Sequence, residues 1–212
     1  GPNGAGKSTL IGQLAGEIAS DEGRIELFGA DVTQVRTHLR AQMGLARTYQ
    51  VTQLAKEFTA LDNVLLAVNA RAKHNFRFWG NAHDDVTSIQ KATTALATVG
   101  MSAMHNATVG TLAHGEQRQL EIAMALATEP KLLLLDEPLA GMSQGESAAI
   151  VALLKSLKGR YPMLLVEHDM EAVFALADRV SVLVYGRIIA TDTPDRIREN
   201  REVRVAYLGD AA

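Results

Sequence analysis

Residues 1–9 read Gly1-Pro2-Asn3-Gly4-Ala5-Gly6-Lys7-Ser8-Thr9 and match the pattern G-x-x-x-x-G-K-[ST] at every fixed position. The glycines at positions 1, 4 and 6 allow positive φ, which turns successive backbone N–H groups toward one point as an anion-binding nest. A helix expected over residues 7–18 adds the positive end of its dipole. The stretch therefore predicts a phosphate-binding loop.

Three side chains of this loop suit a nucleoside triphosphate. The Lys7 ammonium can bind the β- and γ-phosphates, and the Ser8 hydroxyl can ligate Mg²⁺. We expect Thr9 to hydrogen-bond on the α-phosphate side. A glycine-rich turn that matches by chance is the alternative, and motifs farther along the chain argue against it. ATP with Mg²⁺ is the expected ligand.

Two acids follow an apolar run later in the chain. The segment LLLLDE, residues 132–137, predicts a buried strand that ends in Asp136 and Glu137. Ligands bind at the carboxyl ends of parallel strands, so both acids are expected beside the phosphate loop. We expect Asp136 to hold Mg²⁺ and Glu137 to orient or deprotonate the attacking water. An acid pair that only caps the next helix is the alternative.

Apolar runs and helical stripes alternate along most of the sequence. Strands are expected at residues 24–28, 43–49, 132–135, 163–166 and 179–185. Helical stripes lie between them, at Leu120, Ala123, Met124 and Ala127 and at Ile150, Leu153, Leu154 and Leu157. This alternation favours an α/β fold with a parallel sheet.

Residues 59–108 break the alternation, since two helical stripes follow each other without a strand. The stripes are Leu61, Leu65 and Val68, then Ile89, Leu96 and Val99. We interpret 59–108 as an inserted helical subdomain in a core made of residues 1–58 and 109–212. Its loop at residues 71–85 carries three aromatic residues among basic ones, and we expect a partly packed surface loop; a docking surface is the alternative.

The segment LAHGEQRQLEIAMALATEPKLLLLDEPLAGM, residues 112–142, together with GPNGAGKSTL, resembles the nucleotide-binding subunit of ATP-binding-cassette (ABC) transporters. The resemblance implies a P-loop NTPase core with an inserted helical subdomain and an ATPase activity coupled to transport. The family's signature L-S-G-G-Q falls on Leu112, Ala113, His114, Gly115 and Glu116. There, the free N–H groups of a helix opening at Gly115 would bind the γ-phosphate held by a second ATPase subunit.

Two further residues match the family's motifs. Gln50 corresponds to the Q-loop glutamine; its neutral side chain can ligate Mg²⁺ or orient water where the sheet meets the helical insertion. His168, in the sequence VEHDM, corresponds to the switch histidine and can donate a hydrogen bond to the γ-phosphate. We therefore expect Gln50 and His168 to act with Glu137 in catalysis.

A loop of this type normally follows a buried strand, and this sequence shows none ahead of Gly1. We expect the N-terminal strand of the fold, and the aromatic residue that in this family stacks on adenine, to be missing from the chain.

The motifs depart from the family pattern at three places. Ala113 replaces the signature serine and removes one hydroxyl, Glu116 replaces glutamine, and the sequence at 139–142 differs from the common S-A-L-D. The segments ARTYQ, PKLLLLDEP and AYLGD are similar to importers of branched-chain amino acids and urea, which tolerate that last change. The resemblance thus implies an importer, with permease subunits and, indirectly, a solute-binding protein as partners.

Composition adds limits on partners and location. The net charge of −3 gives no general attraction to nucleic acid or acidic lipid, so any membrane role requires a protein partner. The absence of cysteine excludes disulfides and thiolate metal sites. We expect an unprocessed, cytoplasmic chain, peripheral on the inner face of the cell membrane.

Other functions stay open. A cassette ATPase acting on nucleic acid would need basic or coiled-coil insertions, and a small-molecule kinase leaves His168 and the signature unexplained. A nucleotide-binding regulator is favoured only if Ala113 disables the shared site. The sequence specifies neither the transported solute nor whether the dimer is formed by identical or different subunits. The resemblance to importers of branched-chain amino acids and urea favours a heterodimer.

Overall fold

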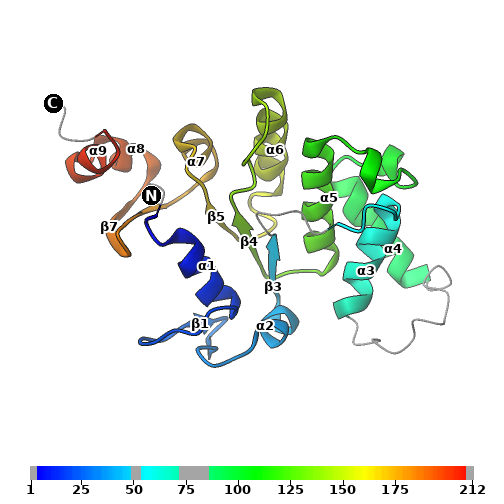
Figure 1. The fold of residues 1–212 in the computed structure, drawn as a ribbon, viewed down its shortest axis with the longest axis horizontal. Helices are drawn as coiled ribbons and strands as arrows, with labels where there is room; N and C mark the ends of the chain where they lie inside the picture. The colour runs from blue at the N-terminus through cyan, green and yellow to red at the C-terminus, as the bar shows by residue number, and fades with distance from the viewer. Residues whose placement is uncertain (1–3, 49–53, 72–85, 209–212) are drawn as a thin grey trace.

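The structure is a computed structural model that describes residues 4–48, 54–71 and 86–208 (Figure 1). Its helices are α1 (Lys7–Ala15), α2 (Thr37–Met43), α3 (Ala60–Arg71), α4 (Val86–Thr98), α5 (His114–Ala127), α6 (Gln144–Leu157), α7 (Met170–Leu176), α8 (Pro194–Glu199) and α9 (Arg201–Leu208). Two 3₁₀ turns are η2 (Ser102–Met104) and η3 (Val109–Thr111). The strands are β1 (Glu26–Leu27), β2 (Ala30–Asp31), β3 (Leu45–Thr48), β4 (Leu132–Asp136), β5 (Met163–Val166), β6 (Val180–Val184) and β7 (Arg187–Asp192).

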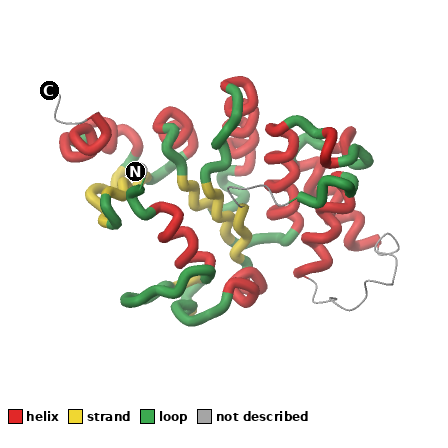
Figure 2. The backbone as a smooth tube through the Cα atoms, viewed as in Figure 1, coloured by secondary structure: helices red, strands yellow, loops and turns green. Residues whose placement is uncertain are grey.

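A parallel sheet in the order β3-β4-β5 lies at the centre of the molecule (Figures 1 and 2). Leu45 of β3 pairs with Leu132, and Leu133 of β4 pairs with Met163 of β5. Side chains of β4 alternate between the two faces. Leu134 packs with Ile11 of α1 on one face, whereas the leucines on either side of it pack with α6 and α7 on the other. The predicted α/β class with a parallel sheet is confirmed.

Several helix ends follow from the local sequence. Gly16 ends α1 in the left-handed region, with φ of 80°. Ser143 caps α6, and Glu146 returns its carboxylate to the Ser143 N–H at 3.0 Å, as a capping box. Asp169 caps α7 through the N–H of Ala172. These caps place the loops that follow β4 and β5.

The prediction of a parallel sheet is wrong for two of the expected strands, at residues 24–28 and 179–185. In the described residues, β1 pairs antiparallel with β2, and β6 pairs antiparallel with β7, which the sequence analysis did not predict. The cause is a two-residue turn in each hairpin, with positive φ at both residues: Phe28-Gly29 and Tyr185-Gly186. Such turns match the twist of antiparallel strands and so join neighbours directly.

Helices α3 and α4 pack against each other and against α5. The two ends of the 59–108 segment meet, because Thr59 and Thr108 form an antiparallel bridge and the Val109 N–H donates to the Phe58 carbonyl at 2.9 Å. The division into a core and an inserted subdomain stays a prediction. The expected loop at 71–85 lies outside the described residues, apart from Arg71.

Strand β5 is one of the two edge strands of the parallel sheet in the described part of the chain. A cavity of about 570 Å³ lies beyond it, lined by β5, β6, α7 and residues of α1 that include Lys7 and Leu10. Leu164 of β5 is 39% exposed there. The expectation of an absent N-terminal strand stays a prediction. No helix in the described ranges has the length and apolar character needed to cross a bilayer.

Candidate nucleotide site

The phosphate loop has the backbone that its glycines predict. Gly4 and Gly6 have φ of 77° and 97°, and Gly6 is the residue that caps α1. The loop rests on the β6–β7 turn, because the Gly186 N–H donates to the Ala5 carbonyl at 2.9 Å. Ser8 and Thr9 are exposed, so their hydroxyls are accessible to a ligand. Gly1, Pro2 and Asn3 lie outside the described residues.

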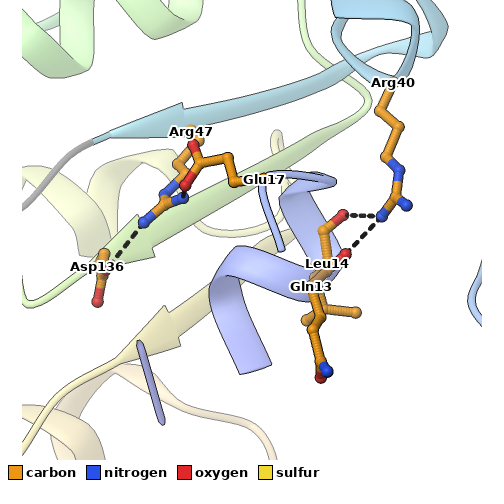
Figure 3. Close-up of polar contacts among 6 residues, drawn as sticks. All are labelled: Gln13, Leu14, Glu17, Arg40, Arg47 and Asp136. Carbon is orange, nitrogen blue, oxygen red and sulfur yellow. Dashed lines mark hydrogen bonds and ion pairs between the residues drawn. The ribbon is translucent and has the colours of Figure 1, made fainter. Parts of the chain in front are cut away.

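Asp136 lies at the carboxyl end of β4 and is buried. Its Oδ2 accepts a hydrogen bond from Arg47 Nη2 at 3.1 Å, and Arg47 also pairs with Glu17 (Figure 3). Within the described residues its Oδ1 is buried and accepts no hydrogen bond. A buried carboxylate oxygen without a partner is costly, and a cation or its bound water would satisfy it.

The described residues around Asp136 suit Mg²⁺ rather than a metal ion that is held by protein ligands alone. In the described ranges no three His, Asp or Glu side chains gather into a metal-binding group. Mg²⁺ usually takes one or two carboxylates and completes its shell with water and substrate phosphates. Gln50, the other expected ligand besides Ser8, lies outside the described residues.

Glu137 and His168, predicted to act together, are neighbours in the structure. His168 Nδ1 lies 3.9 Å from Glu137 Oε1. Glu137 has a φ of 44°, which is uncommon for a residue other than glycine, and its N–H donates to the Val166 carbonyl at 2.9 Å. This conformation turns the chain sharply at the end of β4. Strained residues of this kind cluster at functional sites.

Glu167 is a site residue that the sequence analysis missed. It is buried, and its carboxylate accepts hydrogen bonds from the Leu139 N–H at 2.9 Å and the His168 N–H at 3.1 Å. Glu167 therefore joins the loop after β4 to the loop after β5 and fixes the backbone of His168. Its position at the end of an apolar strand, beside His168, was the available signal.

The signature segment begins α5 one residue before the expected position. The N-cap is Ala113, whose side chain offers no acceptor. The Ala113 N–H donates to Glu116 Oε2 at 2.8 Å, and the Gly115 N–H donates to Glu146 Oε1 at 3.0 Å. The expectation that this helix opens with free N–H groups is therefore wrong at Gly115.

Glu146 is held as a carboxylate mainly by Ser143, with a further contribution from the start of α5. Hydrogen bonds from the Ser143 hydroxyl, the Ser143 N–H and the Gly115 N–H lower the pKa of Glu146 to about 2. A Cβ at position 115 would lie 3.1 Å from Glu146 Cγ, so the glycine leaves room for the Glu146 side chain. In the remaining signature residues, Leu112 is buried and His114 is exposed. The helix start is thus an anion site that a carboxylate of the same chain fills.

Comparison with known proteins places the chain among transport ATPases. The family described as ABC transporter matches residues 1–140, and the family described as branched-chain amino acid ATP-binding cassette transporter matches residues 187–212. The branched-chain amino acid transport ATP-binding protein BraF of Pseudomonas aeruginosa is 37% identical, over 100% of this chain and 86% of its own. LivG of Escherichia coli is 35% identical with the same coverage.

The fold agrees with these sequences. The ADP conformation of MJ1267, an ATP-binding cassette of an ABC transporter, superimposes with a TM-score of 0.84 at 29% identity. The match covers 99% of this chain and 85% of that one. From these matches, the chain belongs to the ABC transporter family, as one of its ATP-binding ATPase cassettes.

Proposed function

We propose that this chain is the ATP-binding and ATP-hydrolysing subunit of an importer for branched-chain amino acids or a similar small polar solute. The observation that carries the proposal is the packing of α1 against β4. A glycine-bounded phosphate loop opens this helix, and the strand ends at Asp136, directly before Glu137. The names of BraF and LivG supply the solute class.

Each side chain of the site has a part in hydrolysis. Lys7 binds the β- and γ-phosphates, and Ser8, Asp136 and Gln50 hold Mg²⁺, which neutralises charge on the phosphate oxygens when bound. Glu137 orients the attacking water and accepts its proton. His168 donates a hydrogen bond to a γ-phosphate oxygen. Glu167 keeps His168 beside Glu137 through the bond to its backbone.

The signature segment supports a dimer as the working unit. Its anion site at Gly115 belongs to the γ-phosphate of ATP bound by a second ATPase subunit, identical or different. Glu146 leaves this site as the dimer closes, since two anions cannot share the Gly115 N–H. ATP binding closes the dimer, and hydrolysis with release of product opens it again.

The candidate permease contact is a cavity of about 580 Å³ lined by α1, α2, β3, α3 and α5. Its lining includes Thr48 and Leu54, on both sides of the segment that contains Gln50, and Glu17 and Arg47 from the core. A helical segment of a permease subunit fits a groove of this kind. The chain would then lie on the inner face of the cell membrane, with the solute-binding protein reached through the permease.

Two experiments test the proposal. The native chain should hydrolyse ATP, and Glu137→Gln should bind ATP but hydrolyse it at least ~100-fold more slowly, the usual range for loss of a general base. Purification from native membranes should recover permease subunits and a binding protein for branched-chain amino acids. Copurification with nucleic acid or with a soluble enzyme alone would contradict the transport role.

A further inference from the structure

Arg47 on β3 connects two carboxylates that are far apart in sequence (Figure 3). Its Nη2 lies 3.1 Å from Asp136 Oδ2, and its Nη1 pairs with Glu17 Oε2. The Arg47 side chain is 13% exposed, that of Asp136 is 4% exposed and that of Glu17 is 33% exposed. The three residues form an ion triad that runs from a partly exposed acid to a buried one.

The triad joins the elements that form the phosphate and metal sites. Glu17 follows the end of α1, whose first turn belongs to the phosphate loop, and Asp136 ends β4. A guanidinium presents several donors in a rigid plane, so one arginine can hold two carboxylates in fixed directions. Arg47 therefore ties the far end of the loop's helix to the carboxylate at the end of the strand.

Only one oxygen of Asp136 is bound by Arg47. Because Oδ2 is held at 3.1 Å, the carboxylate cannot rotate freely, and Oδ1 stays buried without a hydrogen bond from the described residues. The triad carries two negative charges and one positive charge, so it retains a net charge of about −1, which favours a cation. Removing a group that hydrogen-bonds to a metal ligand and orients it usually lowers metal affinity ~10- to 100-fold.

We propose that Arg47 is a positioning residue for the Mg²⁺ carboxylate Asp136 and that Glu17 holds Arg47 in this role. The inference rests on the proposed function, in which Asp136 is the Mg²⁺ ligand. Glu17 and Arg47 also line the cavity of about 580 Å³ assigned to the permease. A molecule bound in that cavity would therefore lie beside Arg47, and the triad would connect the cavity with the Mg²⁺ ligand Asp136.

The test separates metal affinity from nucleotide affinity and from folding. ATP binding by the full chain is titrated in EDTA and at increasing Mg²⁺, for the native chain, Arg47→Gln, Arg47→Lys and Glu17→Gln. Arg24→Gln is the matched control, because Arg24 is an exposed arginine that pairs with two carboxylates, Glu26 and Asp31, on the β1–β2 hairpin. Thermal unfolding of each nucleotide-free variant reports its folding.

Arg47→Gln should leave the Kd for ATP in EDTA within about twofold and raise the Mg²⁺ midpoint on the order of tenfold. Arg47→Lys, which keeps the charge but loses the two-armed geometry, should give an intermediate shift, and Glu17→Gln a smaller one. Arg24→Gln should leave the midpoint unchanged. If Arg47→Gln does not fold, the Mg²⁺ midpoint of Arg47→Lys is compared with those of the native chain and Arg24→Gln instead.

Equal Mg²⁺ midpoints for Arg24→Gln and a folded Arg47 variant would overturn the positioning role. An increase in the Kd for ATP in EDTA equal to the shift with Mg²⁺ would also overturn it, because the defect would then lie in the nucleotide site as a whole. Failure of the proposed function looks different, since the native chain itself would not bind ATP with or without Mg²⁺.

Discussion

The backbone N–H of Gly115 donates a hydrogen bond to Glu146 Oε1 at 3.0 Å. A carboxylate from the first turn of α6 thus accepts a hydrogen bond from a backbone N–H in the first turn of α5. The same carboxylate completes the capping box with Ser143. One side chain thus stabilises two helix starts and occupies the position that we assign to a phosphate of the partner's nucleotide. In the proposed dimer, closure would exchange the Glu146 carboxylate for that phosphate.

The hydrogen bonds that Glu146 accepts, first from Ser143 and then from Gly115, predict a pH dependence of stability. The pKa of Glu146 is lowered from 4.5 to about 2 in the folded chain, so the unfolded chain binds more protons between these values. The stabilisation from Glu146 is therefore complete above about pH 4.5 and is lost as the pH falls toward 2. Urea unfolding at several pH values should show a gap between the native chain and Glu146→Gln that narrows over this window. A constant gap would argue against the hydrogen-bonded carboxylate.

Ala113 predicts a stabilising substitution. As the N-cap of α5 it offers no side-chain acceptor, and serine at such a position contributes about 1 kcal/mol relative to alanine. Ala113→Ser should raise the free energy of unfolding by this amount. Ala149→Ser, on the exposed side of α6, is the control and should change it little. An equal effect of both substitutions would exclude capping as the cause.

Arg40 predicts a large loss of stability. It is buried, and its guanidinium donates to the carbonyls of Gln13 at 2.6 Å and Leu14 at 2.7 Å, at the end of α1 (Figure 3). Hydrogen bonds to a charged group contribute about 1.5–3 kcal/mol, so Arg40→Met should lower the free energy of unfolding by at least ~2 kcal/mol. Arg36→Met, at an exposed neighbour, should stay within ~0.5 kcal/mol. Similar values for the two variants in urea denaturation would contradict this role.

Glu167 predicts a defect in turnover rather than in binding. Glu167→Ala leaves the N–H groups of Leu139 and His168 without their acceptor and releases the backbone of His168, the residue that we propose contacts the γ-phosphate. We expect kcat for ATP hydrolysis to fall on the order of tenfold or more while the Kd for ATP changes little. The exposed Glu171→Gln provides the comparison. A parallel loss of binding and turnover would indicate general disruption instead.

The local parts of the site could be predicted from sequence. The loop around Gly4 and Gly6 follows from glycine's freedom at positive φ, and β4 follows from an apolar run that ends in Asp136. Both depend on neighbours along the chain. The hairpin turns at Phe28-Gly29 and Tyr185-Gly186 escaped because an aromatic residue is an unusual first member of such a turn.

The tertiary contacts could not be predicted in the same way. Arg47 meets Glu17 and Asp136 across 30 and 89 residues of chain, and Gly115 meets Glu146 across 31. In the sequence, Glu17, Arg47 and Glu146 each look like an ordinary surface charge. Their roles follow only from the order β3-β4-β5 and from the packing of α1 on β4 and α5 on α6.

The most direct test of the central claim compares ATP turnover by the native chain and by Glu137→Gln under saturating ATP and Mg²⁺. We propose that Glu137 orients and deprotonates the attacking water; His168 Nδ1 lies 3.9 Å from Glu137 Oε1. The account predicts that the variant binds ATP normally and hydrolyses it at least ~100-fold more slowly. Turnover equal to that of the native chain, with binding intact, would contradict it.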